Sequence, residues 1–160
     1  MISNVISRGI NGKPKMPGDK SISHRSIIIP SISNGICEIN NILKSEDVLH
    51  TINAFKDMGV KIKEKNRKIV VHGNGLNSLK KPSKEIYLGN SGTSARLLTG
   101  LLSSQKFDTV LAGDESLSKR PMKRISDPLS KMNAKIKTNN GTLPIIIKKS
   151  NLIAKNIELE

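Results

Sequence analysis

The stretch that decides the fold is Pro17-Gly18-Asp19-Lys20-Ser21-Ile22-Ser23-His24-Arg25, and Leu88-Gly89-Asn90-Ser91-Gly92-Thr93-Ser94-Ala95-Arg96 has the same shape. Each predicts a tight turn that leads into a helix, over 26–33 and 97–103, with hydroxyl residues before an arginine about one turn in. The first N–H groups of a helix lack intrahelical partners and carry the positive end of its macrodipole. Arginine adds a planar fork that holds phosphate or carboxylate through two hydrogen bonds. The two stretches therefore predict two anion pockets.

These stretches belong to a repeat of about seventy residues. Ser23-His24-Arg25 aligns with Ser94-Ala95-Arg96, 71 positions later, and Met58–Ile62 aligns with Met132–Ile136, 74 positions later. The order of the predicted elements agrees throughout, and a slowly growing offset is what small loop insertions produce. We expect an α/β fold of about two repeated βαβαββ-type units, with helices packed against small mixed sheets. The units are predicted over about 17–72 and 83–150, with a linker over 73–82 and the start of a third unit over 151–160.

Hydrophobic spacing places the remaining elements. In the first unit, a strand over 35–40 precedes a helix with Ser45 as N-cap and Gly59 at its end, and a hairpin of strands over 60–64 and 68–72 follows. The second unit is predicted to contain strands over 83–88 and 109–112, helices over 95–103 and 122–132, and strands over 134–138 and 143–148. A last strand over 156–160 has no partner in the sequence, which makes the pattern an interrupted one.

Charge and composition limit the class of protein. Lysine and arginine total 27 against 13 acidic residues, which gives a net charge of +14 and makes polyanion binding one hypothesis. The lysines are spread along the whole chain, and one tyrosine, two phenylalanines and no tryptophan leave little for base stacking. We therefore favour a small anionic ligand over nucleic acid.

The single cysteine and the apolar segments indicate the compartment. Cys37 excludes an internal disulfide and is expected to be a buried thiol in a reducing environment. The N-terminal residues lack the apolar core of a signal peptide, and no apolar run reaches membrane-spanning length. We expect a cytoplasmic protein without membrane contact. No spacing of Cys, His and acidic residues indicates a metal site.

In the first stretch, Lys20 lies between a strand-like segment and a helix, where its ammonium group can bridge two anions. A generic exposed lysine is the simpler interpretation, but Ser21 and Arg25 crowd the same helix start. His24 directly precedes Arg25 and is therefore predicted to point to the other side of the helix, as a packing or hydrogen-bonding residue.

In the second stretch, Gly89 and Gly92 let backbone amides approach a ligand closely. Asn90 and Thr93 add polar groups in the same turn. Arg96 adds a positive charge, and a structural clamp on neighbouring carbonyl groups is the equal alternative for this residue.

A third cluster runs from Gly113 to Met122. Arg120 precedes Pro121, which suits the first position of a helix, so Arg120 is predicted to be an anion contact at a further helix N-terminus. The adjacent Asp114 and Glu115 are predicted to point apart, and we interpret them as turn and cap residues rather than a catalytic pair.

Together the three clusters resemble the enolpyruvyl transferases, and among them the 5-enolpyruvylshikimate-3-phosphate synthases of the shikimate pathway. The string at 17–25 is specific to those synthases, and the resemblance covers essentially the whole chain. It implies transfer of the carboxyvinyl group of phosphoenolpyruvate to the 5-hydroxyl of shikimate 3-phosphate, by addition and elimination, without metal or organic cofactor.

The resemblance also implies roles for single residues. Lys20 would be the catalytic residue that touches both substrates, and the shikimate 3-phosphate contacts would be Lys20, Ser21 and Arg25. The phosphoenolpyruvate contacts would be Lys20, Asn90, Gly92, Thr93 and Arg120, with Arg96 in a supporting role. Leu97 stands where the plant and enteric branch has proline, so the chain resembles the other bacterial branch.

The resemblance covers part of the family's architecture. Its members are monomers of two domains with three units each, and this chain corresponds to about two units of one domain. Acid and base groups of the second domain would be supplied by the rest of the enzyme. Enolpyruvyl transfer is therefore expected to be incomplete in this chain, and the alternative is a non-catalytic anion-binding fragment that needs a second polypeptide.

Overall fold

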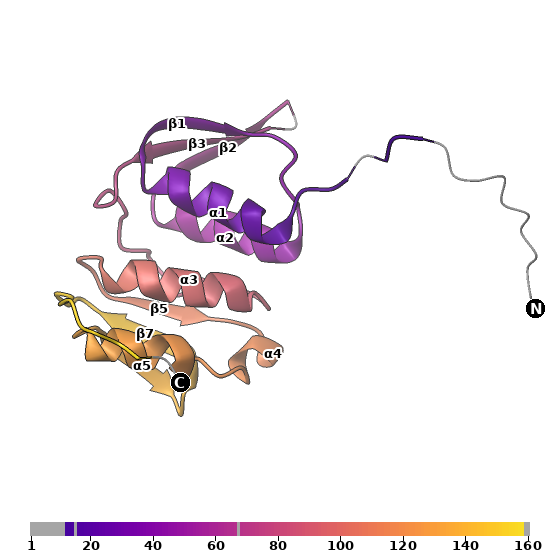
Figure 1. Ribbon diagram of the computed structural model, residues 1–160. Helices are drawn as coiled ribbons and strands as arrows, with labels where there is room; N and C mark the ends of the chain where they lie inside the picture. Colours follow the sequence, from indigo (N-terminus) through magenta and orange to yellow (C-terminus); the bar gives the residue numbers. More distant parts are fainter. Residues whose placement is uncertain (1–11, 15, 67, 159–160) are drawn as a thin grey trace, which may run out of the picture.

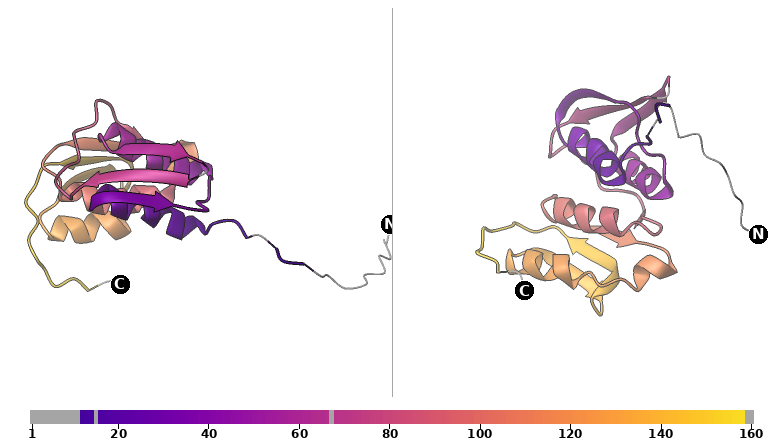
Figure 2. Two further views of the ribbon diagram at one scale, coloured as in Figure 1. Left: turned by 90° about the horizontal axis from the view of Figure 1, so that it is seen from above. Right: turned by 45° about the vertical axis from the view of Figure 1, so that its right-hand side comes forward.

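The computed structural model describes residues 12–14, 16–66 and 68–158. Two small sheets form the outer parts of the molecule, and helices lie between them (Figure 1). Helices α1 and α2 lie along one face of the first sheet, and α3 lies between this pair and the second sheet (Figures 1 and 2). The structure confirms the predicted α/β class.

The first unit forms a three-stranded antiparallel sheet with strand order β1-β3-β2. Its elements are α1 (Lys20–Ser31), β1 (Asn34–Ile39), α2 (Glu46–Asp57), β2 (Lys61–Lys65) and β3 (Lys68–Asn74). Residues 12–14 and 16–19 form no strand, so the predicted strand-like segment before Lys20 is wrong over these residues and the described sheet is not mixed.

The second unit forms a four-stranded mixed sheet with strand order β4-β5-β7-β6, in which β4 and β5 are parallel. Its elements are β4 (Ile86–Tyr87), α3 (Gly92–Ser103), β5 (Thr109–Ala112), α4 (Glu115–Ser118), α5 (Lys123–Lys131), β6 (Lys135–Asn139) and β7 (Thr142–Lys148).

The two sheets repeat the same topology. Cys37 on β1 pairs with Val71 on β3, and Leu111 on β5 pairs with Ile145 on β7 in the same antiparallel manner. Both partners of the second pair lie 74 positions after those of the first. The repeated order of elements predicted from the sequence is thus present in the strand pairing.

One hydrophobic core joins both units. Ile27 and Phe55 from the first unit and Leu98, Leu111 and Ile145 from the second are fully buried in the same cluster. Burial of one such side chain stabilises the fold by roughly 1.5–3 kcal/mol. Because α2 and α3 contribute to this cluster together, neither unit's helices have a core of their own.

The first helices of the two units begin earlier than the sequence predicted. Helix α1 begins at Lys20 because Asp19 is its N-cap, and the carboxylate accepts a hydrogen bond of 2.7 Å from the Ile22 N–H. Helix α3 begins at Gly92 because the Ser91 hydroxyl accepts from the Ser94 N–H. The expected starts at 26 and 97 were wrong because these short polar residues were interpreted as turn residues.

Three other expectations are wrong. Pro121 precedes the N-cap Met122 of α5 and is not the first helical residue, and the short helix α4 was not predicted. Residues 156–158 form no strand, and 159–160 lie outside the described residues. The Cys37 side chain is only partly buried, because it lies near the exposed edge of β1 beside Ile22 and Ile29.

Among the described residues, no helix is both long enough and apolar enough to span a bilayer.

Gly73 on β3 offers a test of how closely β3 packs against the end of α1. A Cβ atom at Gly73 would lie 2.0 Å from the Pro30 carbonyl oxygen and 2.2 Å from that of Ser33, whereas one at Gly100 on α3 would meet nothing within 4 Å. We expect Gly73→Ala to lower the free energy of unfolding by roughly 2–3 kcal/mol. Gly100→Ala should raise it by roughly 0.5–1 kcal/mol.

Urea unfolding of both variants measures these effects. Equal stability of the Gly73→Ala variant and the unmodified chain would contradict the close backbone contact.

Candidate anion-binding site

The first turns of α1 and α2 lie together at one end of the first unit. The Lys20 ammonium group on α1 forms an ion pair with the Asp47 carboxylate on α2. The Lys20 side chain keeps 49% of its surface exposed, whereas that of Asp47 keeps 19%. Asp47 therefore holds Lys20 from the more buried side, and the exposed side of Lys20 stays open to a ligand.

Ser21 and Arg25 lie beside Lys20 on the outer face of α1. They are four residues apart, so their side chains share one face of the helix, and both are exposed. Among the described residues, no carboxylate forms a salt bridge with Arg25. The guanidinium is therefore available to an external anion.

The N-terminus of α1 differs from the predicted pocket in one respect. The Asp19 carboxylate already accepts the Ile22 N–H, so this end of the helix carries a protein anion of its own. A bound phosphate would compete with that carboxylate for the backbone amides. The side chains of Lys20, Ser21 and Arg25, rather than the helix amides, are thus the groups free to hold a ligand here.

The second turn is brought beside the third cluster by the parallel pairing of β4 and β5. The Leu88 N–H donates to the Ala112 carbonyl and the Asp114 N–H donates to the Gly89 carbonyl, both at 2.9 Å. Loops that follow neighbouring parallel strands meet at the same sheet edge, where α/β proteins commonly bind ligands. This pairing places the segment 113–120 against the turn 88–91.

Arg120 reaches across this edge to the second turn. Its guanidinium donates to the Asn90 side-chain oxygen. A Cβ atom at Gly92 would lie 2.9 Å from Arg96 Nη1 and 3.1 Å from Arg120 Nη1, so only glycine leaves both guanidinium groups at this distance. Three of the predicted phosphoenolpyruvate contacts, Asn90, Gly92 and Arg120, therefore lie together, although Arg120 is not at a helix N-terminus as predicted.

Arg96 and Thr93 complete the second turn. Arg96 donates to the Gly92 carbonyl at 3.2 Å and to the Pro121 carbonyl at 3.1 Å, which fixes the third cluster to α3. This contact agrees with the clamp interpretation of Arg96. Thr93 is exposed on the first turn of α3.

The predicted cap role of Asp114 is confirmed. Its carboxylate accepts a hydrogen bond of 2.7 Å from the Leu117 N–H at the start of α4, and Glu115 pairs with Lys119 on the surface. The two adjacent carboxylates serve different partners, as expected for a turn.

A buried polar chain connects the two turns. His24 is fully buried, and its Nδ1 lies 2.8 Å from Thr51 Oγ1 on α2. Thr51 Oγ1 lies 2.6 Å from Ser94 Oγ on α3, which lies 2.6 Å from Ser91 Oγ. The N-terminal halves of three helices are therefore tied together, and both predicted anion pockets lie at one end of the molecule.

Several residues of this site were not predicted from the sequence. Asp19 could have been identified as an N-cap, since a carboxylate directly before a helix is a common capping signal. Asp47 and Thr51 gave no such signal, because their partners Lys20 and His24 lie 27 positions earlier in the chain.

In the described part of the chain, no group of three or more His, Cys, Asp and Glu side chains is placed to hold a metal ion.

The chain is similar to known proteins over most of its length. The family model of EPSP synthase (3-phosphoshikimate 1-carboxyvinyltransferase) matches residues 6–160. The chain belongs to the EPSP synthase family. The chain is 55% identical over 142 residues to a 3-phosphoshikimate 1-carboxyvinyltransferase of Ruthia magnifica, and 53% identical over 148 residues to one of Lactococcus lactis. These alignments cover 89% and 91% of this chain.

A solved EPSP synthase from Acinetobacter baumannii has the same fold over this region. It superposes with a TM-score of 0.88 at 49% identity, over 91% of this chain and 34% of the solved one. The chain spans about a third of the length of its curated EPSP synthase relatives, with 33% covered in Ruthia and 34% in Lactococcus.

The buried histidine predicts a pH-dependent stability. Burial lowers the pKa of His24 below its usual 6.5; Asp47 opposes this shift, while the charges of Lys20 and Arg25 reinforce it. The folded state therefore binds fewer protons at this residue than the unfolded state does. We expect the free energy of unfolding to fall as pH drops below about 6.5, with a limiting slope of ~1.4 kcal/mol per pH unit.

Urea unfolding between pH 7.5 and 5.5 measures this slope, and His24→Gln should flatten it. Among the described residues, Asp108 also has a shifted pKa, which the Lys149 N–H and Lys148 lower, so its contribution to stability is lost only as pH falls below about 3.8. An unchanged slope in His24→Gln would show that another group is responsible.

Proposed function

We propose that this chain supplies part of an enzyme that transfers the enolpyruvyl group of phosphoenolpyruvate to the 5-hydroxyl of shikimate 3-phosphate, in aromatic amino acid biosynthesis. The observation that carries the proposal is the set of cationic side chains gathered at one end of a chain of this family. Both substrates are phosphorylated and phosphoenolpyruvate is also a carboxylate, so a site for the pair needs several separate cationic contacts.

The two turns divide the anions between them in this proposal. Ser21 and Arg25 hold the phosphate of shikimate 3-phosphate from the outer face of α1. Asn90, Gly92, Thr93 and Arg120 hold phosphoenolpyruvate at the second turn, and Arg96 keeps that turn attached to the third cluster.

Lys20 is the proposed catalytic residue of this chain. Its ammonium group lies on the first turn of α1 with Asp47 on its inner side, so its remaining donors face the outer side, where both substrates would meet. There it would neutralise charge on both substrates and hold a proton close to the reacting carbon and oxygen.

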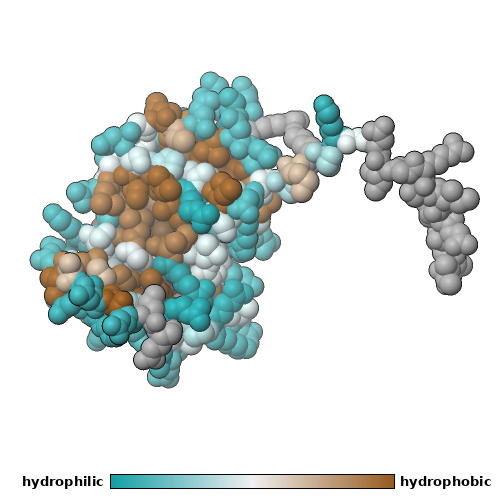
Figure 3. All heavy atoms as spheres, in the orientation of Figure 1, coloured by the Kyte–Doolittle hydropathy of each residue, from teal (hydrophilic) through white to brown (hydrophobic). Residues whose placement is uncertain are grey.

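An exposed apolar surface supports a role for further protein. Ile22 and Ile29 on α1, Ile36 on β1 and Leu97 on α3 are between 40% and 69% exposed. Apolar residues gather over the middle of the face seen in Figure 3. We propose that protein corresponding to the remaining two-thirds of the family's length covers this surface and supplies the missing acid and base groups, in a cytoplasmic monomer with no nucleic-acid partner.

The second candidate function is anion binding without catalysis. It is favoured by the guanidinium of Arg25, which has no salt-bridge partner among the described residues, and by the engagement of the Asp47 carboxylate with Lys20 and of the Asp19 carboxylate with the Ile22 N–H. In this case the chain would bind its ligands and become active only with a second polypeptide.

The binding part of the proposal predicts weak affinity for shikimate 3-phosphate. We expect a dissociation constant in the high-micromolar to millimolar range, roughly −4 to −6 kcal/mol. Arg25→Ala should weaken binding by about 10- to 100-fold, because a charge-assisted pair contributes ~1.5–3 kcal/mol, and Arg25→Lys should restore little. Calorimetric titration measures these constants.

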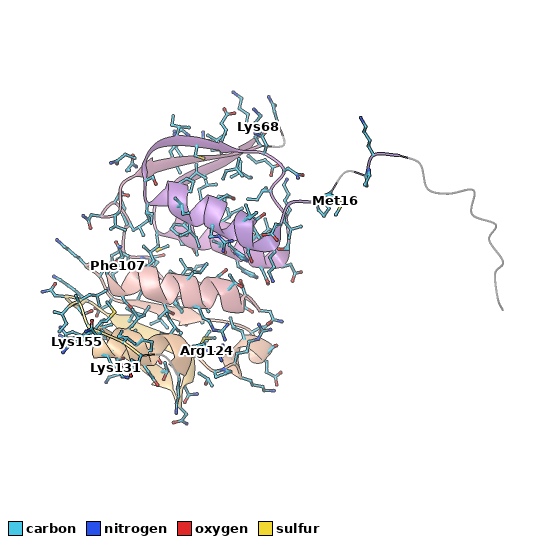
Figure 4. The ribbon with its side chains drawn as sticks, viewed as in Figure 1. Met16, Lys68, Phe107, Arg124, Lys131 and Lys155 are labelled. Atoms are coloured by element: carbon cyan, nitrogen blue, oxygen red, sulfur yellow. The ribbon has the colours of Figure 1, made fainter. Side chains whose placement is uncertain are left out.

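Arg124→Ala is the matched control. Arg124 is an exposed arginine on α5, away from α1 (Figure 4), and its removal changes the net charge by the same amount. Equal losses in the two variants would mean that shikimate 3-phosphate responds to overall charge and not to the proposed site.

The catalytic part predicts no measurable phosphate release by the chain alone from both substrates together. Positioning by the rest of an active site supplies roughly 7–11 kcal/mol of barrier lowering. Addition of a polypeptide comprising the remaining two-thirds of a family member should restore turnover, and Lys20→Met should abolish it. Turnover by the chain alone would overturn this assignment.

A further inference from the structure

The buried polar chain links α1, α2 and α3 through side chains. Four polar side chains, His24, Thr51, Ser91 and Ser94, are each fully buried, and they come from α1, α2, the N-cap of α3 and its first turn. Burial of hydroxyl and imidazole groups is unfavourable unless they are hydrogen-bonded. Apart from His24 Nε2, the polar atoms of these side chains find hydrogen-bond partners among one another, so each helix depends on the other two.

The unpaired ring nitrogen of His24 indicates which atoms donate and which accept along the buried polar chain. His24 Nε2 is buried and has no hydrogen-bond partner. An unpaired buried N–H is rarer than an unpaired buried acceptor, so the proton belongs on Nδ1, which donates to Thr51 Oγ1 at 2.8 Å. Thr51 gives its own proton to the Asp47 carbonyl, so Ser94 donates to Thr51 Oγ1 and Ser91 donates to Ser94 Oγ.

At one end of the buried polar chain is Ser91, which belongs to the second turn. The Ser91 hydroxyl also accepts the Ser94 N–H, at 3.2 Å, and so caps α3 directly beside Gly92. At its other end, His24 lies between Lys20 and Arg25 in sequence, and Thr51 Oγ1 also donates to the carbonyl of Asp47, the residue whose carboxylate holds Lys20. Both ends of the chain thus adjoin groups assigned to ligands.

We propose that His24, Thr51 and Ser94 are positioning residues that fix the second anion-binding turn, at the start of α3, relative to the first, at the start of α1. They contact no ligand and act through Ser91 and Asp47. The inference rests on the proposed function only in assigning a ligand to each turn. Its consequence is that a ligand on α1 favours binding at α3, because the two turns cannot shift independently.

The matched variants Thr51→Val and Thr99→Val test the positioning role of the buried polar chain without any ligand. Both threonines are fully buried and both hydroxyls donate to the carbonyl four residues earlier, but among the described residues only Thr51 also reaches another helix. We expect Thr51→Val to speed amide hydrogen exchange of Ser94 and Ala95 about tenfold. Thr99→Val should leave these rates unchanged, and Thr51→Ser should restore them.

Nitrogen-15 NMR of the histidines provides a second measurement. The expected spectrum shows His24 protonated on Nδ1, with Nε2 bare. Protonation on Nε2, or equal exchange rates in the Thr51→Val and Thr99→Val variants, would overturn the proposal.

Titration with phosphoenolpyruvate, with and without saturating shikimate 3-phosphate, tests the consequence. Shikimate 3-phosphate should tighten phosphoenolpyruvate binding in the unmodified protein and in Thr99→Val. In Thr51→Val this enhancement should be at least about fivefold smaller. The affinity of Thr51→Val for each ligand alone should stay within about twofold of that of the unmodified protein. An enhancement that survives in Thr51→Val overturns the inference. If neither ligand binds, the proposed function fails, while the exchange rates still test whether the buried polar chain fixes the start of α3.

Discussion

The need of buried polar groups for hydrogen-bond partners is the constraint on which this structure depends. His24, Thr51 and Ser94 lie on three different helices, are fully buried and hydrogen-bond across those helices. Their mutual hydrogen bonds hold the N-terminal halves of α1, α2 and α3 at the same end of the molecule. The hydrophobic core also brings the helices together. Apolar contacts are not directional, however, and would tolerate a shift of one helix along its axis relative to the others.

The parallel pair β4 and β5 provides the second part of the site. A two-residue strand contributes little stability, yet it sets where the following loops meet. With Leu88 and Asp114 hydrogen-bonded across this edge, Arg120 comes within reach of Asn90 although 30 positions separate them. The first unit has no equivalent parallel strand among its described residues, so its turn presents only the side chains of α1.

Charge at the two turns is balanced differently. At the first turn, Asp19 accepts from the helix end and Asp47 neutralises Lys20, whereas Arg25 has no salt-bridge partner in the part of the chain that the structure describes. At the second, Arg96 and Arg120 approach the same glycine, and the atoms near them are carbonyl and amide oxygens rather than carboxylates. Two guanidinium groups held this close repel one another, and a bound anion would relieve that repulsion. Among the described residues, the second turn therefore has two guanidinium groups without a carboxylate partner, and the first turn has one.

The amino-acid sequence by itself determined the repeated order of helices and strands, the strand over 109–112 and the cap role of Asp114, because these follow from local periodicity and from side chains that bond within a few residues. It also predicted the family whose model matches residues 6–160. Only the tertiary structure decided that Asp47 holds Lys20, that Asn90 meets Arg120 and that His24 joins Thr51. Those partners are distant in sequence, and no local pattern encodes which buried donor finds which acceptor once the helices pack.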